Sequence, residues 1–163
     1  MKAVVQRVSD ASVSVDGKIT GRIDFGLLVY LGVAIDDSAK DADWLVEKIT
    51  NLRIFDDSEG KMNHSLMNIV DNSLVNYNLK EVNENVIGVL VISQFTLLGD
   101  AKKGRRPSWA KAADPEKAQE LYNYFNHKIR EQGILCETGI FQAIMKVQYT
   151  NEGPVTILLD SKE

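Results

Sequence analysis

Two short polar stretches contain the residue types most able to take part in chemistry. The first consists of Ser93, Gln94, Phe95 and Thr96, and it follows directly on the apolar run at residues 88–92. A polar group at the end of a buried strand is held rigidly, which suits a working residue. The second consists of Asn151, Glu152, Gly153 and Pro154. Glycine permits a positive φ and proline fixes its own, so this composition also fits an ordinary surface turn.

Cations form a third candidate site. The basic loop contains Lys102, Lys103, Arg105 and Arg106 around Gly104. It fits a solvated loop or, with Trp109 nearby, a grip on phosphates. The net charge of −4 excludes a general polyanion binder, so any contact with nucleic acid must be local. Arg7 lies inside the apolar run 2–9, where a cation faces solvent or pairs with a carboxylate.

Several familiar kinds of site are excluded by the motifs and residue counts. The chain has no nucleophile elbow, Walker loop, zinc-protease helix motif or dinucleotide fingerprint. Two histidines and the single Cys136 argue against a metal centre and fit a reducing cytoplasm, and we expect no cofactor. No apolar run is long enough to span a membrane. The acids at residues 56–61 are predicted to be a solvated turn, because their spacing matches no calcium loop.

The elements that must position these residues follow from periodicity. The 163 residues suit one domain, residues 1–163, of mixed α/β class with two main helices. We predict about four strands in the first 35 residues, a helix after Ser38 with Trp44 on its core face, and a second helix from Asp114 to about Gln132. Buried strand 88–92 and late strands 145–149 and 155–160 complete the sheet, and residues 68–87 are predicted to form a surface excursion.

The two polar stretches resemble the signature motifs of the D-aminoacyl-tRNA deacylases. Residues 93–97 and 151–156 carry the resemblance. The opening residues 1–8, the 60–63 segment, the 103–108 loop and the Asp114-Pro115 helix start are also similar, in the same order. The resemblance covers nearly the whole chain. It implies a single deacylase domain with a mostly antiparallel, curved, barrel-like sheet.

That resemblance implies an activity and a set of partners. The family hydrolyses the ester between a D-amino acid, or glycine mischarged on tRNA-Ala, and the 3′ end of tRNA. It implies a cytoplasmic, tRNA-binding homodimer that proofreads chirality and contacts neither DNA nor membrane. In the family the Gly-Pro bond is cis, and Gly153-Pro154 of one subunit would enter the site of the other beside residues 93–96. Arg7 would help to hold this prong.

The physical logic of such a site is consistent. A backbone wedge cannot move aside, so overlap with one methyl group suffices to reject an L-amino acid. The ester is already activated, and the 2′-OH of the terminal ribose can assist, so the enzyme needs mainly to position water and to polarise the carbonyl through N–H groups near Phe95 and Thr96. A covalent role for Thr96 would need a base, and no base is evident.

Two alternatives and one departure remain open at this stage. The chain could be a non-catalytic tRNA- or nucleotide-binding module on the same scaffold, or a general hydrolase of small esters. It departs from the family where Phe-Gly-Ala is usual, because it has Phe141-Gln142-Ala143. A glutamine there adds bulk near the expected pocket for the terminal adenosine.

Overall fold

A long hairpin begins the chain. The computed structural model describes residues 1–71, 86–102 and 104–163. Strands β1 (Lys2–Val15) and β2 (Lys18–Gly32) pair antiparallel across the predicted Asp16-Gly17 turn. The predicted meander of about four strands is therefore wrong, because both strands continue through the positions interpreted as breaks. Gly26 stays within β2 at φ 139°, and a Cβ there would meet the Gly88 carbonyl oxygen at 2.0 Å.

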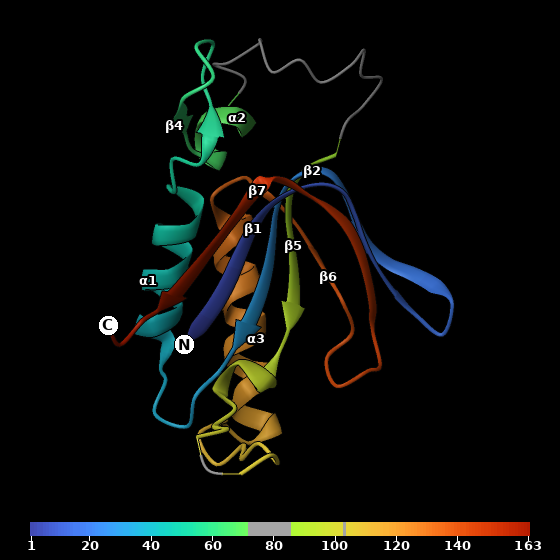
Figure 1. Cartoon of the computed structure of the whole chain (residues 1–163), viewed down its shortest axis with the longest axis vertical. Helices are drawn as coiled ribbons and strands as arrows, with labels where there is room; N and C mark the ends of the chain where they lie inside the picture. The colour runs from blue at the N-terminus through green and yellow to red at the C-terminus, as the bar shows by residue number, and fades with distance from the viewer. Residues whose placement is uncertain (72–85, 103) are drawn as a thin grey trace.

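A five-stranded mixed sheet is built on this hairpin, in the order β6-β5-β2-β1-β7 (Figure 1). Strand β7 (Lys146–Asp160) pairs antiparallel with β1, whereas β5 (Ile87–Ser93) lies parallel to β2 and β6 (Leu135–Thr138) lies parallel to β5. The strongly apolar runs of β2 and β5 are explained by their central places, where both faces are covered.

Two helices cover one face of the sheet. Helix α3 (Pro115–Glu131) lies behind β1, β2 and β5 in Figure 1 and packs against α1 (Ala39–Thr50). Asp114 caps α3 by accepting from two backbone N–H groups, with proline in the first turn. The buried residues between helices and sheet form one large core that includes Leu27, Leu45 and Phe125. The predicted α/β class with two main helices is confirmed.

The start of α1 carries a buried carboxylate. Asp41 closes a capping box with Ser38 and also accepts from the Ser161 hydroxyl and pairs with Lys162 at 2.8 Å. Although burial alone would raise the pKa of Asp41, the hydrogen bonds from Lys162, Ser161 and Ser38 hold it well below the ordinary value. The charged form of this side chain therefore stabilises the fold.

A small excursion leaves the core after α1. It consists of the two-stranded sheet of β3 (Phe55–Asp56) and β4 (Met62–His64), followed by the short helix α2 (Leu66–Val70). The predicted excursion at residues 68–87 lies mostly outside the described residues, which resume at residue 86. None of the helices in the described ranges has the length and apolar character to cross a bilayer.

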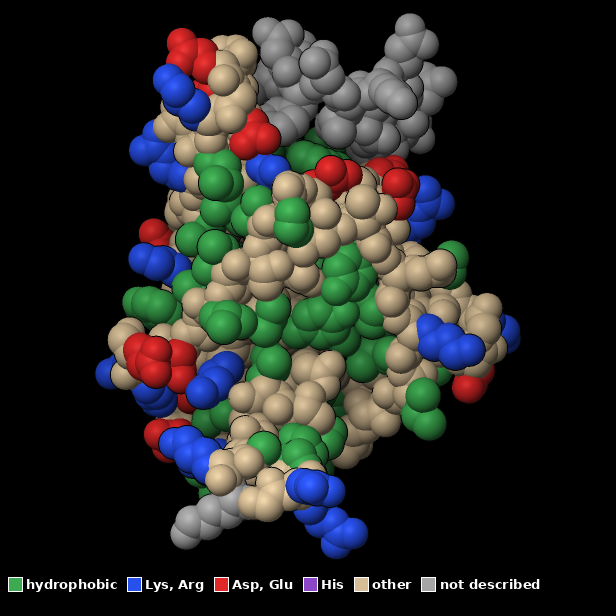
Figure 2. Space-filling view, viewed as in Figure 1, with side chains coloured by type: hydrophobic (Ala, Val, Ile, Leu, Met, Phe, Trp, Pro, Cys, Tyr) green, Lys and Arg blue, Asp and Glu red, His purple; other side chains and the backbone are tan. Residues whose placement is uncertain are grey.

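The sheet face turned away from the helices is also apolar. Its buried cluster includes Leu28, Leu90 and Ile92, with Tyr30 and Tyr149 half-buried beside it. Leu158 projects from the same face, because its neighbour Leu159 packs on the helix side, and it is 76% exposed. Hydrophobic side chains are gathered over the middle of this face in Figure 2. Such a patch is typical of an interaction surface.

Candidate active site

A cleft of 540 Å³ opens at the carboxyl end of β5, between the sheet and the start of α3. Ser93, Gln94 and Phe95 enter it directly after the strand. Apolar and aromatic side chains form most of the remaining wall: Leu31, Val33, Ile92, Trp109, Ala112, Ala113, Pro115, Ala118, Tyr122, Phe141, Ala143, Met145 and Val147, with Gln142 at the rim. Parallel strands commonly place a ligand site at this edge.

Residues 93–96 change from strand to helix at the cleft. The N–H of Gln94 donates to the Leu31 carbonyl at 2.8 Å, which ties the end of β5 to β2. Phe95 then begins the 3-10 helix η1 (Phe95–Leu98), so the first N–H groups of this turn have no partner within it. Within the described residues, neither the Phe95 nor the Thr96 N–H donates to a backbone carbonyl. Gln94 Nε2 donates to the Thr96 hydroxyl.

The described lining of the cleft contains no carboxylate, histidine, lysine or cysteine. Its one ionisable side chain is Tyr122, whose hydroxyl donates to the Val91 carbonyl at 2.8 Å. Burial raises the pKa of Tyr122 further above its ordinary value, so it stays neutral. His127 pairs with Glu131 on the outer face of α3, and His64 lies in β4. No group of three potential metal ligands occurs among the residues that the structure describes.

Gln142 adopts a backbone conformation that usually belongs to glycine. Its φ is 63°, in the left-handed region, and it lines the cleft beside Phe141. The Phe141 ring packs against Tyr122 with the ring centroids 5.9 Å apart. The departure from the family pattern therefore falls at a position where the fold itself favours glycine, and where a side chain reaches the ligand space.

The Gly-Pro stretch forms a bulge within β7, where the sequence predicted a break between two strands. The register pairs Gln6 with Thr156 but Val8 with Asn151, so Arg7 alone lies opposite four residues of β7. At the tip, Gly153 has φ 115°, the Gly153–Pro154 bond is cis, and both residues are exposed. We call residues 152–155 the prong.

Side-chain hydrogen bonds brace the prong from below. Asn151 spans its base, accepting from the Val155 N–H at 3.3 Å and donating to the Thr156 hydroxyl at 3.1 Å. Ser9 donates to the Glu152 carboxylate at 2.5 Å. The backbone of the bulge is therefore held at both ends while its tip faces outward.

Arg7 is buried beneath the prong and is 9% exposed. Its Nη1 donates to the Ile54 carbonyl at 2.8 Å and lies 3.1 Å from Asp56 Oδ1. Its Nη2 lies 3.1 Å from the position that a Cβ on Gly153 would occupy. Pairing with a carboxylate, one of the two interpretations of Arg7 from the sequence, is confirmed, and its guanidinium also abuts the prong.

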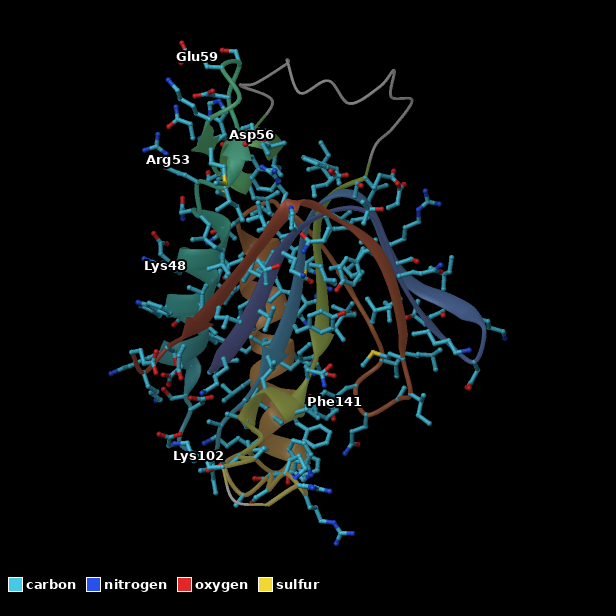
Figure 3. The ribbon with its side chains drawn as sticks, viewed as in Figure 1. Lys48, Arg53, Asp56, Glu59, Lys102 and Phe141 are labelled. Carbon is cyan, nitrogen blue, oxygen red and sulfur yellow. The ribbon has the colours of Figure 1, made fainter. Side chains whose placement is uncertain are left out.

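The prong and the cleft of one chain lie at different ends of the molecule. Asp56, which contacts Arg7, is at one end of the view in Figure 3, and Phe141, which lines the cleft, is toward the other. Neither Gly153 nor Pro154 is among the residues that line the cleft. The two predicted halves of the site are therefore not brought together within one chain.

The basic loop lies next to the cleft. Asp100 and Ser108 exchange two backbone hydrogen bonds, of 2.9 and 2.8 Å, and so close the loop at its base. Lys102, Arg105 and Arg106 are exposed, and none of them forms an ion pair with a described residue. Lys103 lies outside the described residues. Figure 3 places Lys102 at the same end of the molecule as Phe141.

Two features of the site were not found from the sequence. Asp56 was assigned to a solvated turn, but it ends β3 and pairs with Arg7. Trp109 was named only as a neighbour of the basic loop and Phe141 only as a neighbour of Gln142, although both side chains line the cleft. The signal for Asp56 was its place just before the 60–63 segment that resembles the family. No local pattern distinguishes the two aromatic residues from ordinary core residues.

Comparison with known families and proteins gives matches over the full length. A family model described as D-Tyr-tRNA(Tyr) deacylase matches residues 4–160. A D-aminoacyl-tRNA deacylase of Kosmotoga olearia is 54% identical over 163 residues, covering all of this chain and 99% of that protein. A D-aminoacyl-tRNA deacylase of Bacillus cereus is 47% identical over 162 residues, covering 99% of this chain and 100% of that protein.

Solved structures are similar as well. A c-Myc DNA unwinding element binding protein superposes with a TM-score of 0.83 at 37% identity, covering 98% of each chain. A probable eukaryotic D-amino acid tRNA deacylase superposes with a TM-score of 0.76 at 17% identity, covering 97% of each chain. The second likeness concerns the fold alone.

Proposed function

The chain belongs to the D-aminoacyl-tRNA deacylase family, and we propose that it hydrolyses the ester of D-aminoacyl-tRNA, and of glycine mischarged on tRNA-Ala, to the free amino acid and tRNA. The observation that carries the reaction is the 54% identity to a deacylase over all 163 residues. The cleft is apolar and its described lining contains no carboxylate, histidine, lysine or cysteine, which restricts how the reaction can proceed.

We assign the catalytic work to the turn that enters the cleft. A water molecule attacks the ester carbonyl, the bond to the ribose 3′ oxygen breaks, and that oxygen takes up a proton with help from the neighbouring 2′-OH. The N–H groups of Phe95 and Thr96 would stabilise the negative charge on the carbonyl oxygen, a contribution typically of ~3–4 kcal/mol for one donor. Ser93 and Gln94 would orient the substrate, and the Thr96 hydroxyl is already engaged by Gln94.

The selection of handedness is assigned to the prong of a second copy of the chain. The exposed tip at Gly153 and Pro154 has no place in its own cleft, while an apolar sheet face with Leu158 is available for a two-fold contact. In such a homodimer each prong would enter the partner's cleft and collide with an L side chain. Arg7 would hold the prong in place, since its Nη1 pairs with Asp56 of β3 and its Nη2 lies 3.1 Å from the position of a Cβ on Gly153.

The basic loop would bind the tRNA backbone next to the cleft. Lys102, Arg105 and Arg106 are exposed and free of ion pairs with described residues, and Lys103 belongs to the same segment of sequence. Each phosphate contact releases about one counterion, so Arg105→Gln and Arg106→Gln should each lower the slope of log K against log salt by about 1. An unaltered salt slope would remove the loop from the interface. The free Cys136 fits the cytoplasm as the compartment.

The direct test compares D- and L-aminoacyl-tRNA carrying the same amino acid. The purified protein should release the D-amino acid and leave the L-aminoacyl ester intact over the same interval. Binding of tRNA without release of either amino acid would instead identify a non-catalytic binding module. Comparable turnover of simple esters without RNA would identify a general esterase.

A mixing experiment tests whether the prong acts in the partner's cleft. Thr96→Ala removes the hydroxyl that accepts from the cleft residue Gln94, and Gly153→Ala alters the prong, so each variant alone should be defective. A mixed dimer assembles one site from an intact cleft and an intact prong, and mixing should therefore restore selective activity in one site of each heterodimer. Mixtures that behave as the average of the two variants would show that the prong serves its own chain.

A further inference from the structure

Two aromatic rings form an exposed step at the mouth of the cleft. Phe95 is 57% exposed and Trp109 is 41% exposed, and both line the cleft. Their ring centroids are 5.2 Å apart at an interplanar angle of 72°, an edge-to-face pair. Large aromatic side chains that stay about half exposed at the edge of a cavity can stack on flat ligands.

The backbone holds this step in place. A Cβ on Gly99 would lie 2.6 Å from the Trp109 ring, so the indole rests directly on the glycine backbone. Trp109 also lies between two fixed points: the Asp100–Ser108 bridge precedes it, and the bridge between Ala34 and Ala112 follows it. The ring is therefore preorganised, with one side against the protein and the rest open to a ligand.

We propose that the Phe95–Trp109 step stacks the unpaired cytosine bases that precede the terminal adenosine of the tRNA. This inference rests on the proposed function, which places the terminal ester in the cleft. A strand leaving the cleft would pass the two rings and then reach the basic loop, whose exposed Lys102, Arg105 and Arg106 form no ion pair with a described residue. Proteins commonly hold single strands by combining aromatic side chains that stack bases with cations that contact the backbone.

The charge pattern selects this occupant over an apolar one. An apolar protein segment docking on the two rings would gain nothing from three cations that form no ion pair with a described residue, whereas each nucleotide carries a base for stacking and a phosphate for the loop. The step thus explains how a protein of net charge −4 recognises an RNA end. The bases, rather than charge alone, would contribute much of the affinity.

The kinetic test compares a D-aminoacyl minihelix ending in CCA with D-aminoacyl-adenosine. The ratio of their kcat/KM values measures what the additional nucleotides contribute. Trp109→Ala should lower this ratio roughly 5- to 150-fold, the range expected for one stacked base. Trp44→Ala is the matched control, because Trp44 is 40% exposed but lies on α1 outside the cleft. An equal ratio in the Trp109 variant would overturn the proposal.

A binding test separates the proposal from the proposed function. In a Trp44→Phe background, Trp109 is the one remaining tryptophan. Its fluorescence should be quenched by a CCA trinucleotide, and much less by the same backbone with abasic sites in place of both cytidines. Equal quenching by both oligonucleotides would refute stacking. If the wild type deacylates nothing, the proposed function fails, and this titration still decides whether the Phe95–Trp109 step stacks cytosine bases.

A subunit contact at the same place would also overturn the proposal. If Trp109→Ala converts a dimer into a monomer in size-exclusion chromatography, the step faces the partner chain rather than RNA. An unchanged elution volume together with the lowered kinetic ratio supports the RNA-binding step. Trp109→Phe should keep most of the ratio, since phenylalanine retains a face for stacking.

Discussion

The substitution Gly153→Ala tests the role of the prong most directly, because the atoms that an added methyl group would contact are known from the structure. The new Cβ would lie 2.9 Å from Val155 Cγ2 and 3.1 Å from Arg7 Nη2, both tighter than ordinary contacts. The φ of 115° is in addition poorly accessible to an L-residue, at a cost of ~1–3 kcal/mol. The bulge must therefore shift, and Arg7 must withdraw from it.

The expected outcome is a loss of selection larger than the loss of catalysis. The stability should fall by ~1–3 kcal/mol, which corresponds to a drop in Tm of roughly 2–4 °C for each kcal/mol. A wedge displaced by a few tenths of an ångström would no longer exclude a methyl-sized group. Because one such group is typically worth 10- to 200-fold, hydrolysis of L-aminoacyl-tRNA should rise by roughly that factor relative to the D-ester.

The assay measures release from D- and L-aminoacyl-tRNA at a temperature where the variant is folded by circular dichroism. Gly17→Ala is the control, since Gly17 has φ 77° but nothing within 4 Å of its added Cβ. It incurs backbone strain in the hairpin turn without disturbing Arg7, so its selectivity should stay at the wild-type value. A folded Gly153→Ala protein with unchanged discrimination between D and L would refute the role assigned to the prong.

Three further substitutions or treatments give checks on the fold and the cleft. Asp41→Asn should lower the free energy of unfolding by roughly 1–2 kcal/mol at pH 7. The difference between wild type and variant should shrink as the pH falls below the ordinary carboxyl pKa of 3.8, because the hydrogen bonds that lower the pKa of Asp41 stabilise only its ionised form. A difference in unfolding free energy that does not change with pH in urea titrations would contradict this. Burial raises the pKa of Cys136 to about 11, so the native protein should react with a thiol reagent at pH 8 only after unfolding in urea; rapid native labelling would contradict this burial. Gln142→Gly should change the free energy of unfolding by less than about 1 kcal/mol, since relief of the left-handed conformation offsets the added freedom of the unfolded chain. The same substitution should lower KM. A large loss of stability, or a higher KM, would show that the glutamine side chain is needed.

Local patterns predicted those parts of the fold that depend on neighbours in sequence. The cap and proline at Asp114-Pro115 fix the start of α3, and the Asp16-Gly17 pair fixes the first hairpin. Strand continuity was harder, because Gly26 indicates a break in any local interpretation. It stays in β2 since β5 approaches so closely there that no Cβ fits, and this contact joins residues 62 positions apart in the chain.

The candidate site was proposed from its motifs, and the residues that surround those motifs in space were only partly predicted. Residues 93–96 and the Gly-Pro stretch were proposed as site residues because they resemble the two signature motifs of the family, whereas the Gly-Pro composition alone also fits an ordinary surface turn. The partner of Arg7 could not, since Asp56 is polar, lies in an acidic segment and reaches Arg7 through tertiary contact alone. Trp44 shows the converse error. It was assigned to the helix face in the core, yet it is 40% exposed with the Lys48 ammonium 6.0 Å from its ring centroid.

The separation of cleft and prong within one chain is consistent with the roles proposed for them. A cleft that relies on backbone N–H groups and on the substrate's own hydroxyl needs dry, apolar walls, which strengthen weak dipoles. A wedge must instead be stiff and project outward, which requires a bulge on an edge strand braced by polar groups such as Asn151 and Arg7. One sheet edge cannot supply both without burying those polar groups in the cleft. In the proposed homodimer, placing them on opposite ends and joining two copies would satisfy both requirements, and the handedness filter would then be a property of the assembly that is lost whenever the chain is alone.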